Sequence, residues 1–333
     1  RVNYCKLGMV WPLPEQMLRD FAASCREVYV IEELDPFLEE ACLAMGLPVK
    51  GKQLFTLLGE YTPSMIRKGI LGEEPAPFSA PREALPARPP VMCAGCPHRG
   101  TFYVLSKLGL VVSGDIGCYT LGAAAPLSSV DTTICMGASV SAAHGMAKVR
   151  GSEFAKKLVS VIGDSTFIHS GITGLIDIVY NKGINTVIIL DNSITGMTGH
   201  QDNPTTGKTI RGEATRQVDL IGLCRSVGID HIKVADPFDV KHFEAVVRQE
   251  VEREEPSVII AQRPCALLKK VRYTGHCRVS DRCRKCKVCM KIGCPAISLE
   301  PGTGAVSIDV TQCNGCGLCV GVCPFHAIEK EEN

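Results

Sequence analysis

Eight cysteines near the C-terminus constrain the fold of this chain more than any other feature of its sequence. They form two runs, Cys283-x2-Cys286-x2-Cys289-x4-Cys294-Pro295 and Cys313-x2-Cys316-x2-Cys319-x3-Cys323-Pro324. The segment that carries them, residues 273–333, is interrupted by Gly and Pro and is too short to build a hydrophobic core of its own. We therefore expect an inorganic centre to hold this segment together.

The spacing of these cysteines indicates which centre to expect. Three thiolates at such intervals can wrap one face of an iron–sulfur cubane, and the fourth cysteine of each run then ligates the other cluster. Zinc knuckles, the alternative, use pairs of cysteines separated by a long loop. The segment resembles a two-cluster ferredoxin domain, with one extra residue before Cys294. The predicted [4Fe–4S] ligands are Cys283, Cys286, Cys289 and Cys323 for the first cluster, and Cys294, Cys313, Cys316 and Cys319 for the second.

The remaining composition is that of an ordinary globular chain. Among 333 residues, 36 Lys and Arg balance 35 Asp and Glu, which argues against a generally basic nucleic-acid-binding protein. No apolar run approaches the roughly 18 residues of a membrane span, and no secretory pattern follows Arg1. The 18 cysteines then favour metal binding over disulfides. We expect a cytoplasmic protein with no membrane or nucleic-acid partner and, because the chain opens with Arg1, a piece of a longer polypeptide.

Four segments follow one another along the chain. Residues 1–71 are predicted to form a small α/β unit, and residues 72–90, with six prolines, a linker. Residues 91–272 alternate β-branched runs with helical stretches, which is typical of an α/β fold with a parallel sheet. The cysteine-rich segment 273–333 comes last. The strands expected in the third segment are Leu110–Ser113, Leu158–Ile162, Thr186–Leu190 and Val258–Ala261, and the helices are Ala138–Val149, Gly171–Asn181, Gln217–Val227 and Val240–Glu252.

Polar residues follow two of the expected strands. Asp164 comes after the strand that ends at Ile162, and Asn192 comes after the next one. Ligands of parallel α/β sheets bind beyond the carboxyl ends of strands. Two such oxygen ligands, with a helix expected from Gly171, could bind a divalent cation and a phosphate group. An N-capping Asp and a turn Asn are the structural alternative.

The same residues resemble the thiamine-diphosphate motif, in which Gly-Asp-Gly is followed about 30 residues later by Asn-Asn. Ser165 replaces the third Gly and Asp191 the first Asn, but both metal-binding side chains are retained. Thr198-Gly199-His200-Gln201 resembles the Thr-Gly-x-Gln segment of 2-oxoacid:ferredoxin oxidoreductases. The resemblance implies that Mg²⁺ is held by Asp164, Asn192 and the carbonyl of Ile194, and that the cofactor is bound by His98, Gly137, Gly163, Asp164, Ser165, Asn192 and Thr195.

Two of these implied roles rest on position in the family motif. A third residue, His169, is singled out because it lies five residues after Asp164, where the next expected helix opens. His98 would lie against the diphosphate, although a structural histidine is an alternative. Gly137 would lie near the aminopyrimidine, although it could equally serve close packing of a helix. His169 is the candidate catalytic residue, as a proton donor or a substrate contact near the reactive carbon of the cofactor.

Four further cysteines, Cys93, Cys96, Cys118 and Cys265, come at or near expected strand ends. In 2-oxoacid:ferredoxin oxidoreductases, a proximal [4Fe–4S] cluster is held by four cysteines in this order relative to the thiamine motif. Separate buried thiols are the alternative, and they are the preferred interpretation for the remaining scattered cysteines: Cys5, Cys25, Cys42, Cys135 and Cys224. Cys277 exceeds the count of four ligands per cluster and is given no role.

Together these features resemble the C-terminal portion of the large, thiamine-diphosphate-binding subunit of the indolepyruvate:ferredoxin oxidoreductase family. The sequence Cys-x-x-Cys-Pro-His-Arg at 93–99 matches this branch, and residues 1–71 resemble a transketolase C-terminal-like domain. The resemblance implies oxidative decarboxylation of a 2-oxoacid, an arylpyruvate such as indolepyruvate, to acyl-CoA and CO2, with electrons passed to ferredoxin. The same chemistry on pyruvate or another 2-oxoacid, or a non-catalytic iron–sulfur electron-transfer subunit, are the alternatives.

The family also implies partners. They are a small β subunit, ferredoxin, coenzyme A, the 2-oxoacid, and an N-terminal pyrimidine-binding region or chain that supplies an activating Glu. Glu32 and Glu33 lie in the wrong segment to replace that Glu. A hetero-oligomer of dimerised heterodimers is expected.

Overall fold

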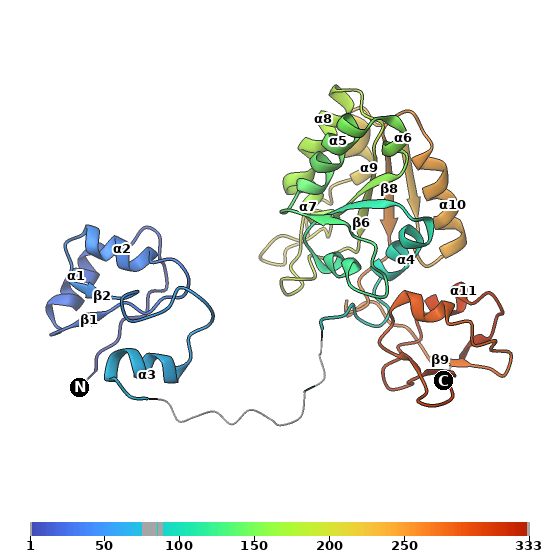
Figure 1. The fold of residues 1–333 in the computed structure, drawn as a ribbon. Coiled ribbons are helices and arrows are strands. Elements are labelled where there is room, and N and C mark those ends of the chain that lie inside the picture. Colours follow the sequence, from blue (N-terminus) through green and yellow to red (C-terminus); the bar gives the residue numbers. More distant parts are fainter. Residues whose placement is uncertain (1, 75–84, 86–88, 332–333) are drawn as a thin grey trace. The chain divides into compact units, whose positions relative to one another are not determined.

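The chain forms two compact units, residues 1–87 and 88–333 (Figure 1). The computed structural model describes residues 2–74, 85 and 89–331. Most of the linker expected at residues 72–90 lies outside the described residues. Within the described residues, no helix is long and apolar enough to cross a membrane.

The first unit is a small α/β arrangement. Its elements are α1 (Glu15–Ala23), β1 (Val28–Tyr29), α2 (Phe37–Ala44), β2 (Val49–Lys50) and α3 (Pro63–Leu71), and β1 pairs with β2 in parallel. The Glu32 carboxylate accepts hydrogen bonds from the Leu38 and Glu39 amides at 2.8 and 2.9 Å, at the first turn of α2. The Glu33 carboxylate accepts one from the Tyr61 amide at 2.8 Å. Both acidic side chains therefore have structural partners inside this unit.

The second unit is built on a six-stranded, fully parallel sheet with the order β4-β3-β5-β6-β8-β7. The expected α/β fold with a parallel sheet is thus confirmed. The strands are β3 (Val111–Gly114), β4 (Thr132–Thr133), β5 (Leu158–Gly163), β6 (Thr186–Asp191), β7 (His231–Ala235) and β8 (Ser257–Gln262). The two edge strands were not predicted from the sequence. Of these, β4 has two residues, and β7 is only partly buried and so lacks a continuous apolar run.

Helices cover both faces of this sheet. The helices α4 (His98–Leu108) and α10 (Val240–Val251) share one core with Ile188 and Leu190 of β6. The helices α5 (Ala138–Arg150), α8 (Ile172–Tyr180) and α9 (Leu220–Ser226), with the short α6 (Ser152–Ala155) alongside α5, lie over the opposite face, where Val187 and Ile189 point. Alternate strand residues thus enter alternate cores, as the pleat requires. Helix α4 was not among the expected helices.

The chain becomes helical directly after β5, which corrects the expected helix start at Gly171. A helical turn, α7 (Asp164–Thr166), leads into a π-helical turn, Phe167–Gly171, and then into α8. Glycine is a common helix boundary in sequence, but here Gly171 packs against Ile162 inside a continuous helical path. As a result, Asp164 itself occupies the first helical position after the strand.

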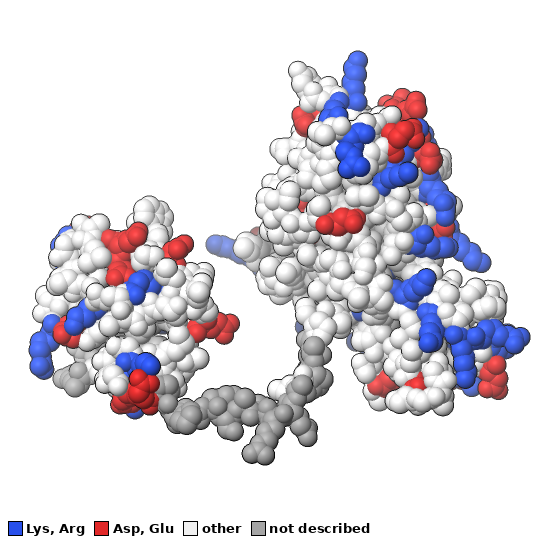
Figure 2. All heavy atoms as spheres, viewed as in Figure 1, with Lys and Arg blue, Asp and Glu red and all other residues white. Residues whose placement is uncertain are grey.

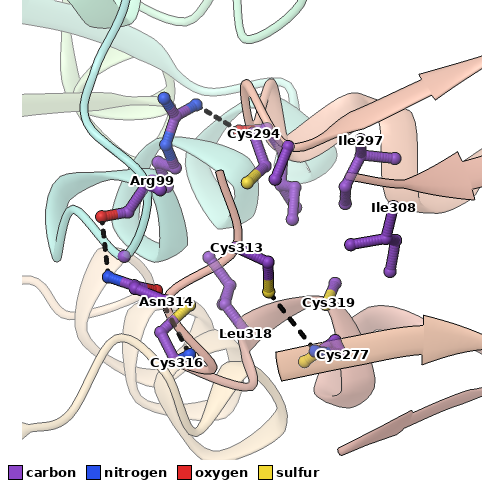
Figure 3. A pocket seen from close by; sticks show the side chains of 14 residues that line it. Arg99, Cys277, Cys294, Ile297, Ile308, Cys313, Asn314, Cys316, Leu318 and Cys319 are labelled. Carbon is purple, nitrogen blue, oxygen red and sulfur yellow. Dashed lines mark hydrogen bonds between the residues drawn. The ribbon is translucent and has the colours of Figure 1, made fainter. Parts of the chain in front are cut away.

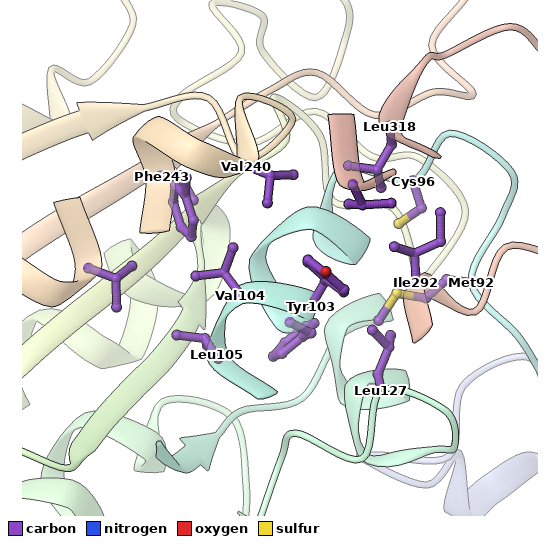
Figure 4. Packing of buried hydrophobic residues seen from close by; sticks show 14 of the residues in the cluster. Met92, Cys96, Tyr103, Val104, Leu105, Leu127, Val240, Phe243, Ile292 and Leu318 are labelled. Carbon is purple, nitrogen blue, oxygen red and sulfur yellow. The ribbon is translucent and has the colours of Figure 1, made fainter. Parts of the chain in front are cut away.

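The cysteine-rich segment packs onto the α4 and α10 side of the sheet domain. It contains β9 (His276–Val279) paired with β12 (Ile328–Glu331), β10 (Ile297–Leu299) paired with β11 (Val306–Ile308), a 3₁₀ turn (Val288–Ile292) and α11 (Leu318–Val322). Ile292 and Leu318 enter the same core as Tyr103 and Val240 (Figure 4). This shared core gives the segment the apolar support that its own length cannot provide.

Candidate cofactor and iron–sulfur sites

Asp164 and Asn192 meet at the carboxyl edge of the sheet. Strands β5 and β6 are neighbours, with Gly163 opposite Leu190, so the residues that follow them lie close together. Both side chains are buried. The Asn192 amide nitrogen lies 3.5 Å from Nε2 of His98, which begins α4, and the Asn192 amide oxygen accepts a hydrogen bond from the Ile194 amide at 3.3 Å. The fold thus brings five predicted site residues to one edge: His98, Gly163, Asp164, Asn192 and Ile194.

The electrostatics of Asp164 suit a cation. Burial, together with the nearby Asp191 carboxylate, raises the pKa of Asp164 to about 6. Its carboxylate accepts hydrogen bonds from the Ser165 amide at 2.8 Å and from the Thr205 hydroxyl at 3.0 Å. The largest influences on this pKa are burial, hydrogen bonds and the Asp191 carboxylate, and none of them is a positively charged side chain. A buried carboxylate of this kind, beside an amide oxygen, fits a Mg²⁺ ion that also takes phosphate oxygens.

Thr205 was missed by the sequence analysis. It lies 41 positions after Asp164 and belongs to no recognisable motif, so no sequence signal could have placed it there. Thr195 does not contact Asp164 directly. Its hydroxyl accepts a hydrogen bond from Asn203 at 3.3 Å, and the Asn203 amide oxygen lies 2.6 Å from the Thr205 hydroxyl, whose single proton it shares with Asp164. The loop after β6 is therefore folded back over the Asp164 side chain.

A second buried carboxylate, Asp115, organises the turn that contains Gly137. It accepts hydrogen bonds from the Gly137 amide at 3.0 Å and from the Ser139 amide at 3.1 Å, at the start of α5. Gly137 has a φ of +88°, and a Cβ there would lie 2.4 Å from Cβ of Ser170. Only glycine fits this turn without strain. Asp115 was not predicted as a site residue, although it follows strand β3 just as Asp164 follows β5.

The two candidate histidines differ in environment. His98 is buried, which lowers its pKa to about 4, and its ring packs edge-on against Tyr119 with centroids 5.7 Å apart. It is therefore neutral at pH 7. His169 is exposed in the π-helical turn, where Nδ1 lies 2.5 Å from the Ser170 hydroxyl. Because Gly137 packs on Ser170, His169 lies next to the Gly137 turn, and its catalytic role stays a prediction.

Tyr119 is a further residue that the sequence analysis missed. Its hydroxyl donates to the Ile116 carbonyl at 2.9 Å, and its ring covers Gly163, where a Cβ would lie 2.9 Å from the ring. Close packing, rather than an unusual backbone angle, therefore requires glycine at position 163. The ring closes one side of the edge between His98 and Gly163.

Cys93, Cys96, Cys118 and Cys265 converge at the same carboxyl edge. Burial raises the pKa of Cys118, and the nearby Cys265 and Cys93 raise it further. Burial likewise raises the pKa of Cys96 to about 12, with smaller contributions from Cys93 and Cys118. The backbone amide of Cys265 donates to the Asn192 carbonyl at 2.9 Å. Four thiols are thus gathered next to a predicted metal ligand.

The eight C-terminal cysteines surround two cavities. Cys283, Cys286, Cys289 and Cys323 line one, and Cys294, Cys313, Cys316 and Cys319 line the other together with Cys277 (Figure 3). Within the part of the chain that the structure describes, no three His, Cys, Asp or Glu residues are arranged around one metal ion. A [4Fe–4S] cubane needs no such arrangement, because each of its four irons is bound by a different cysteine.

Arg99 and Asn314 fasten the Cys93–Cys96 loop to the second of these cavities. Arg99 is buried, and its guanidinium donates hydrogen bonds to four backbone carbonyls: those of Met92, Cys93, Ile292 and Gly293. The Asn314 side chain donates to the Ala94 carbonyl at 3.0 Å (Figure 3). The candidate proximal cluster loop and the second cavity are therefore held side by side.

Comparison with known proteins agrees with these sites. A model of the thiamine pyrophosphate enzyme C-terminal TPP binding domain matches residues 115–261, and one of the 4Fe-4S binding domain matches residues 306–329. Indolepyruvate oxidoreductase subunit IorA from Archaeoglobus fulgidus is 40% identical and that from Thermococcus kodakarensis 36%; each alignment covers 98% of this chain. The chain is therefore similar to these IorA subunits over nearly all of its length. It spans about half the length of the curated relatives it matches, 56% in both cases.

The structural comparison is more distant. A chain of 2-oxoglutarate:ferredoxin oxidoreductase from Magnetococcus marinus matches with a TM-score of 0.45 and 18% identity, over 55% of this chain and 67% of that chain. Asp164 and Asn192 lie in the segment that matches the thiamine pyrophosphate domain, and Cys313–Cys323 lies in the segment that matches the 4Fe-4S domain. A thiamine-diphosphate-binding domain and an iron–sulfur-binding segment are therefore present in this chain.

Proposed function

We propose that this chain is the thiamine-diphosphate-binding and electron-transferring part of an enzyme that oxidatively decarboxylates a 2-oxoacid and reduces ferredoxin. The observation that carries the proposal is a continuous arrangement inside one compact unit. The Asp164–Asn192 edge, the four cysteines beside it, and the two C-terminal cysteine cavities follow one another. A decarboxylase that releases an aldehyde would have no use for this series of thiols.

The residues of the sheet edge fit the cofactor. Asp164, Asn192 and the Ile194 carbonyl would hold Mg²⁺, and Gly163, Ser165 and Thr195 would lie around the diphosphate. When bound, thiamine diphosphate supplies the carbanion chemistry at the 2-oxo carbon. The protein keeps His98 neutral and buried against Asn192, which excludes water from this side. Asp115 fixes the Gly137 turn, and His169 beside it is the proposed proton donor or substrate contact.

Cys93, Cys96, Cys118 and Cys265 are proposed to hold a proximal [4Fe–4S] cluster. They lie between the Asn192 carbonyl on one side and Asn314, next to the second cavity, on the other. Oxidation of the 2-oxoacid releases two electrons, whereas each cluster accepts one at a time. Clusters at successive positions would carry these electrons singly away from the sheet edge.

The first C-terminal cavity is the proposed exit for electrons. Cys286 is exposed, and exposed basic side chains surround it in sequence: Arg282, Arg284, Lys285, Lys287 and Lys291. Figure 2 shows Lys and Arg side chains gathered over the C-terminal part of the chain. A basic surface beside a cluster favours an acidic protein acceptor, and a ferredoxin is the acceptor we propose.

The printed name of the relatives, indolepyruvate oxidoreductase subunit IorA, supports indolepyruvate as the substrate and a multi-subunit enzyme. The other details are proposed from the resemblance stated above. The substrate is indolepyruvate or another arylpyruvate, the product is its acyl-CoA, and the compartment is the cytoplasm. A small β subunit and a pyrimidine-binding region with an activating Glu complete the enzyme as a hetero-oligomer. A non-catalytic electron-transfer subunit is the alternative, but it would not need a buried carboxylate such as Asp164 at the sheet edge.

The test uses the complex assembled with its partner subunit and the pyrimidine-binding region. Turnover is measured with indolepyruvate, phenylpyruvate, pyruvate and 2-oxoglutarate, and we expect the highest kcat/KM for an arylpyruvate. Asp164→Ala should abolish binding of thiamine diphosphate while leaving the iron content unchanged. Asp177→Ala, on the exposed side of α8, is the control and should bind normally. Full cofactor occupancy in Asp164→Ala would contradict the proposal.

A further inference from the structure

The second C-terminal cavity holds one thiol more than a cubane requires. Cys277 lies on β9 and is 1% exposed, and it lines this cavity with the four predicted ligands (Figure 3). Its neighbours on the strand, His276 and Arg278, are more exposed, so the pleat directs Cys277 inward. Pairing of Cys277 with Lys330 of β12 fixes this register.

Cys277 lies among the predicted ligands of the second cluster. Its backbone amide donates to Sγ of Cys313 at 3.3 Å, and its side chain lines the same cavity as Cys319 (Figure 3). A cluster with four irons and four cysteine ligands leaves the fifth thiol without iron. A buried thiol in that position finds its hydrogen-bond acceptors among the cluster sulfurs and the Cys319 sulfur.

We propose that Cys277 is a reserve ligand of the second cluster. While Cys319 ligates its iron, the Cys277 thiol donates its S–H to a cluster sulfur. When Cys319 is absent, Cys277 binds that iron itself. Because Cys319 is then absent, no Cys319–iron bond has to break, and Cys277 fills the open iron site during cluster assembly without oxidation or reduction. The Cys277 thiol releases its proton to solvent and its sulfur forms the bond to iron. The inference rests on the proposed cluster ligands and not on the 2-oxoacid chemistry.

The chain offers a matched control for this proposal. Cys289 and Cys319 are the third cysteines of their runs, and they are 8% and 7% exposed. The cavity around Cys289 is lined by four cysteines, whereas the cavity around Cys319 is lined by five. Removing Cys289 or Cys319 therefore deletes an equivalent ligand from two cavities, of which only the second contains a fifth thiol, Cys277.

The experiment compares alanine variants of the full chain, purified anaerobically with its partner subunit. We expect Cys289→Ala to lose about four Fe and the spectrum of one cluster. We expect Cys319→Ala to keep its iron, with an altered electron paramagnetic resonance spectrum of one cluster. The double variant Cys277→Ala/Cys319→Ala should lose about four Fe. Loss of the same iron in Cys319→Ala alone would overturn the reserve-ligand role.

The single variants test the hydrogen bond. Cys277→Ala should keep all iron and lower the midpoint potential of one cluster, because hydrogen bonds to cluster sulfurs raise it. Cys277→Ser retains a donor and should lie between the alanine variant and the wild type. An unchanged potential in both variants would overturn the hydrogen bond. Iron content and spectra are measured without a 2-oxoacid, so a failure of the catalytic proposal would leave these results unaffected.

Discussion

At the scale of the residue, Asp164 couples protonation to cofactor binding. Its pKa of about 6 means that Mg²⁺ must displace a proton at lower pH. We expect affinity for Mg²⁺ and thiamine diphosphate to fall steadily as the pH drops below about 6. In the protein without cofactor, the free energy of unfolding has the opposite pH dependence from the cofactor affinity. The contribution of Asp164 to the free energy of unfolding is complete below pH 3.8 and is lost as the pH rises through about 6.

Calorimetric titrations between pH 5 and 8 check this behaviour, within the range set by the raised pKa of Asp164. Asp164→Asn removes the titrating group and should bind weakly at every pH. An affinity of the wild type that is constant across this range would show that another residue carries the cation.

Gly137 has a backbone conformation that only glycine adopts easily. Its φ of +88° and the 2.4 Å approach to Ser170 predict that Gly137→Ala lowers the free energy of unfolding by about 1–3 kcal/mol. Gly145 lies within α5, the helix that follows Gly137, and has nothing within 4 Å of its potential Cβ. Gly145→Ala should instead stabilise the protein by up to about 1 kcal/mol. Urea unfolding of both variants measures the difference, and equal effects would contradict the assigned strain.

At the scale of the element, Arg99 joins α4 to the cysteine-rich segment. Arg99→Met would leave four backbone carbonyls without their charged donor, two of them on each side of the contact. We expect the free energy of unfolding to fall by about 3 kcal/mol. Arg248→Met, which removes an exposed ion pair with Glu244, should cost less than about 0.5 kcal/mol. Denaturant unfolding distinguishes the two, and a similar small loss for both would refute the fastening role.

The ends of β3 and β8, together with the loop before α4, carry the proposed proximal cluster. The double variant Cys96→Ser/Cys118→Ser should lose about four Fe and acid-labile sulfide while the spectrum of a two-cluster ferredoxin remains. Cys135→Ser, at an exposed thiol, is the control and should lose none. An anaerobically prepared wild type with about eight Fe, unaltered by the double substitution, would leave these four cysteines as plain thiols.

At the scale of the whole molecule, charge predicts how electrons leave. Electron transfer from the dithionite-reduced protein to oxidised ferredoxin should slow as ionic strength rises, because attraction between opposite charges is screened. Arg284→Glu combined with Lys287→Glu should lower the second-order rate at least about tenfold. Lys148→Glu combined with Arg150→Glu reverses the same number of charges at the end of α5 and should have little effect. Stopped-flow absorbance measures both. Equal slowing by the two variants would exclude a specific surface around Cys286.

The features that depend on neighbouring residues along the chain could be predicted from the sequence alone. The two cysteine runs predict their clusters because ligand spacing within a run is a local property. The buried strands β5 and β6 show as continuous apolar runs because both of their faces are covered. The placement of Asp164 and Asn192 at one edge follows from the same reasoning, since parallel strands end on the same side.

The contacts between side chains that are distant in sequence were found only in the tertiary structure. Thr205 reaches Asp164, Arg99 reaches the carbonyls at 292 and 293, and Cys277 enters the second cavity. None of these contacts has a sequence signal, because each depends on how separate elements pack rather than on the spacing of residues within one element. The helix start at Asp164 and the edge strand β7 could not be predicted from the sequence for a related reason. Packing against neighbouring elements, rather than local preference, stabilises both.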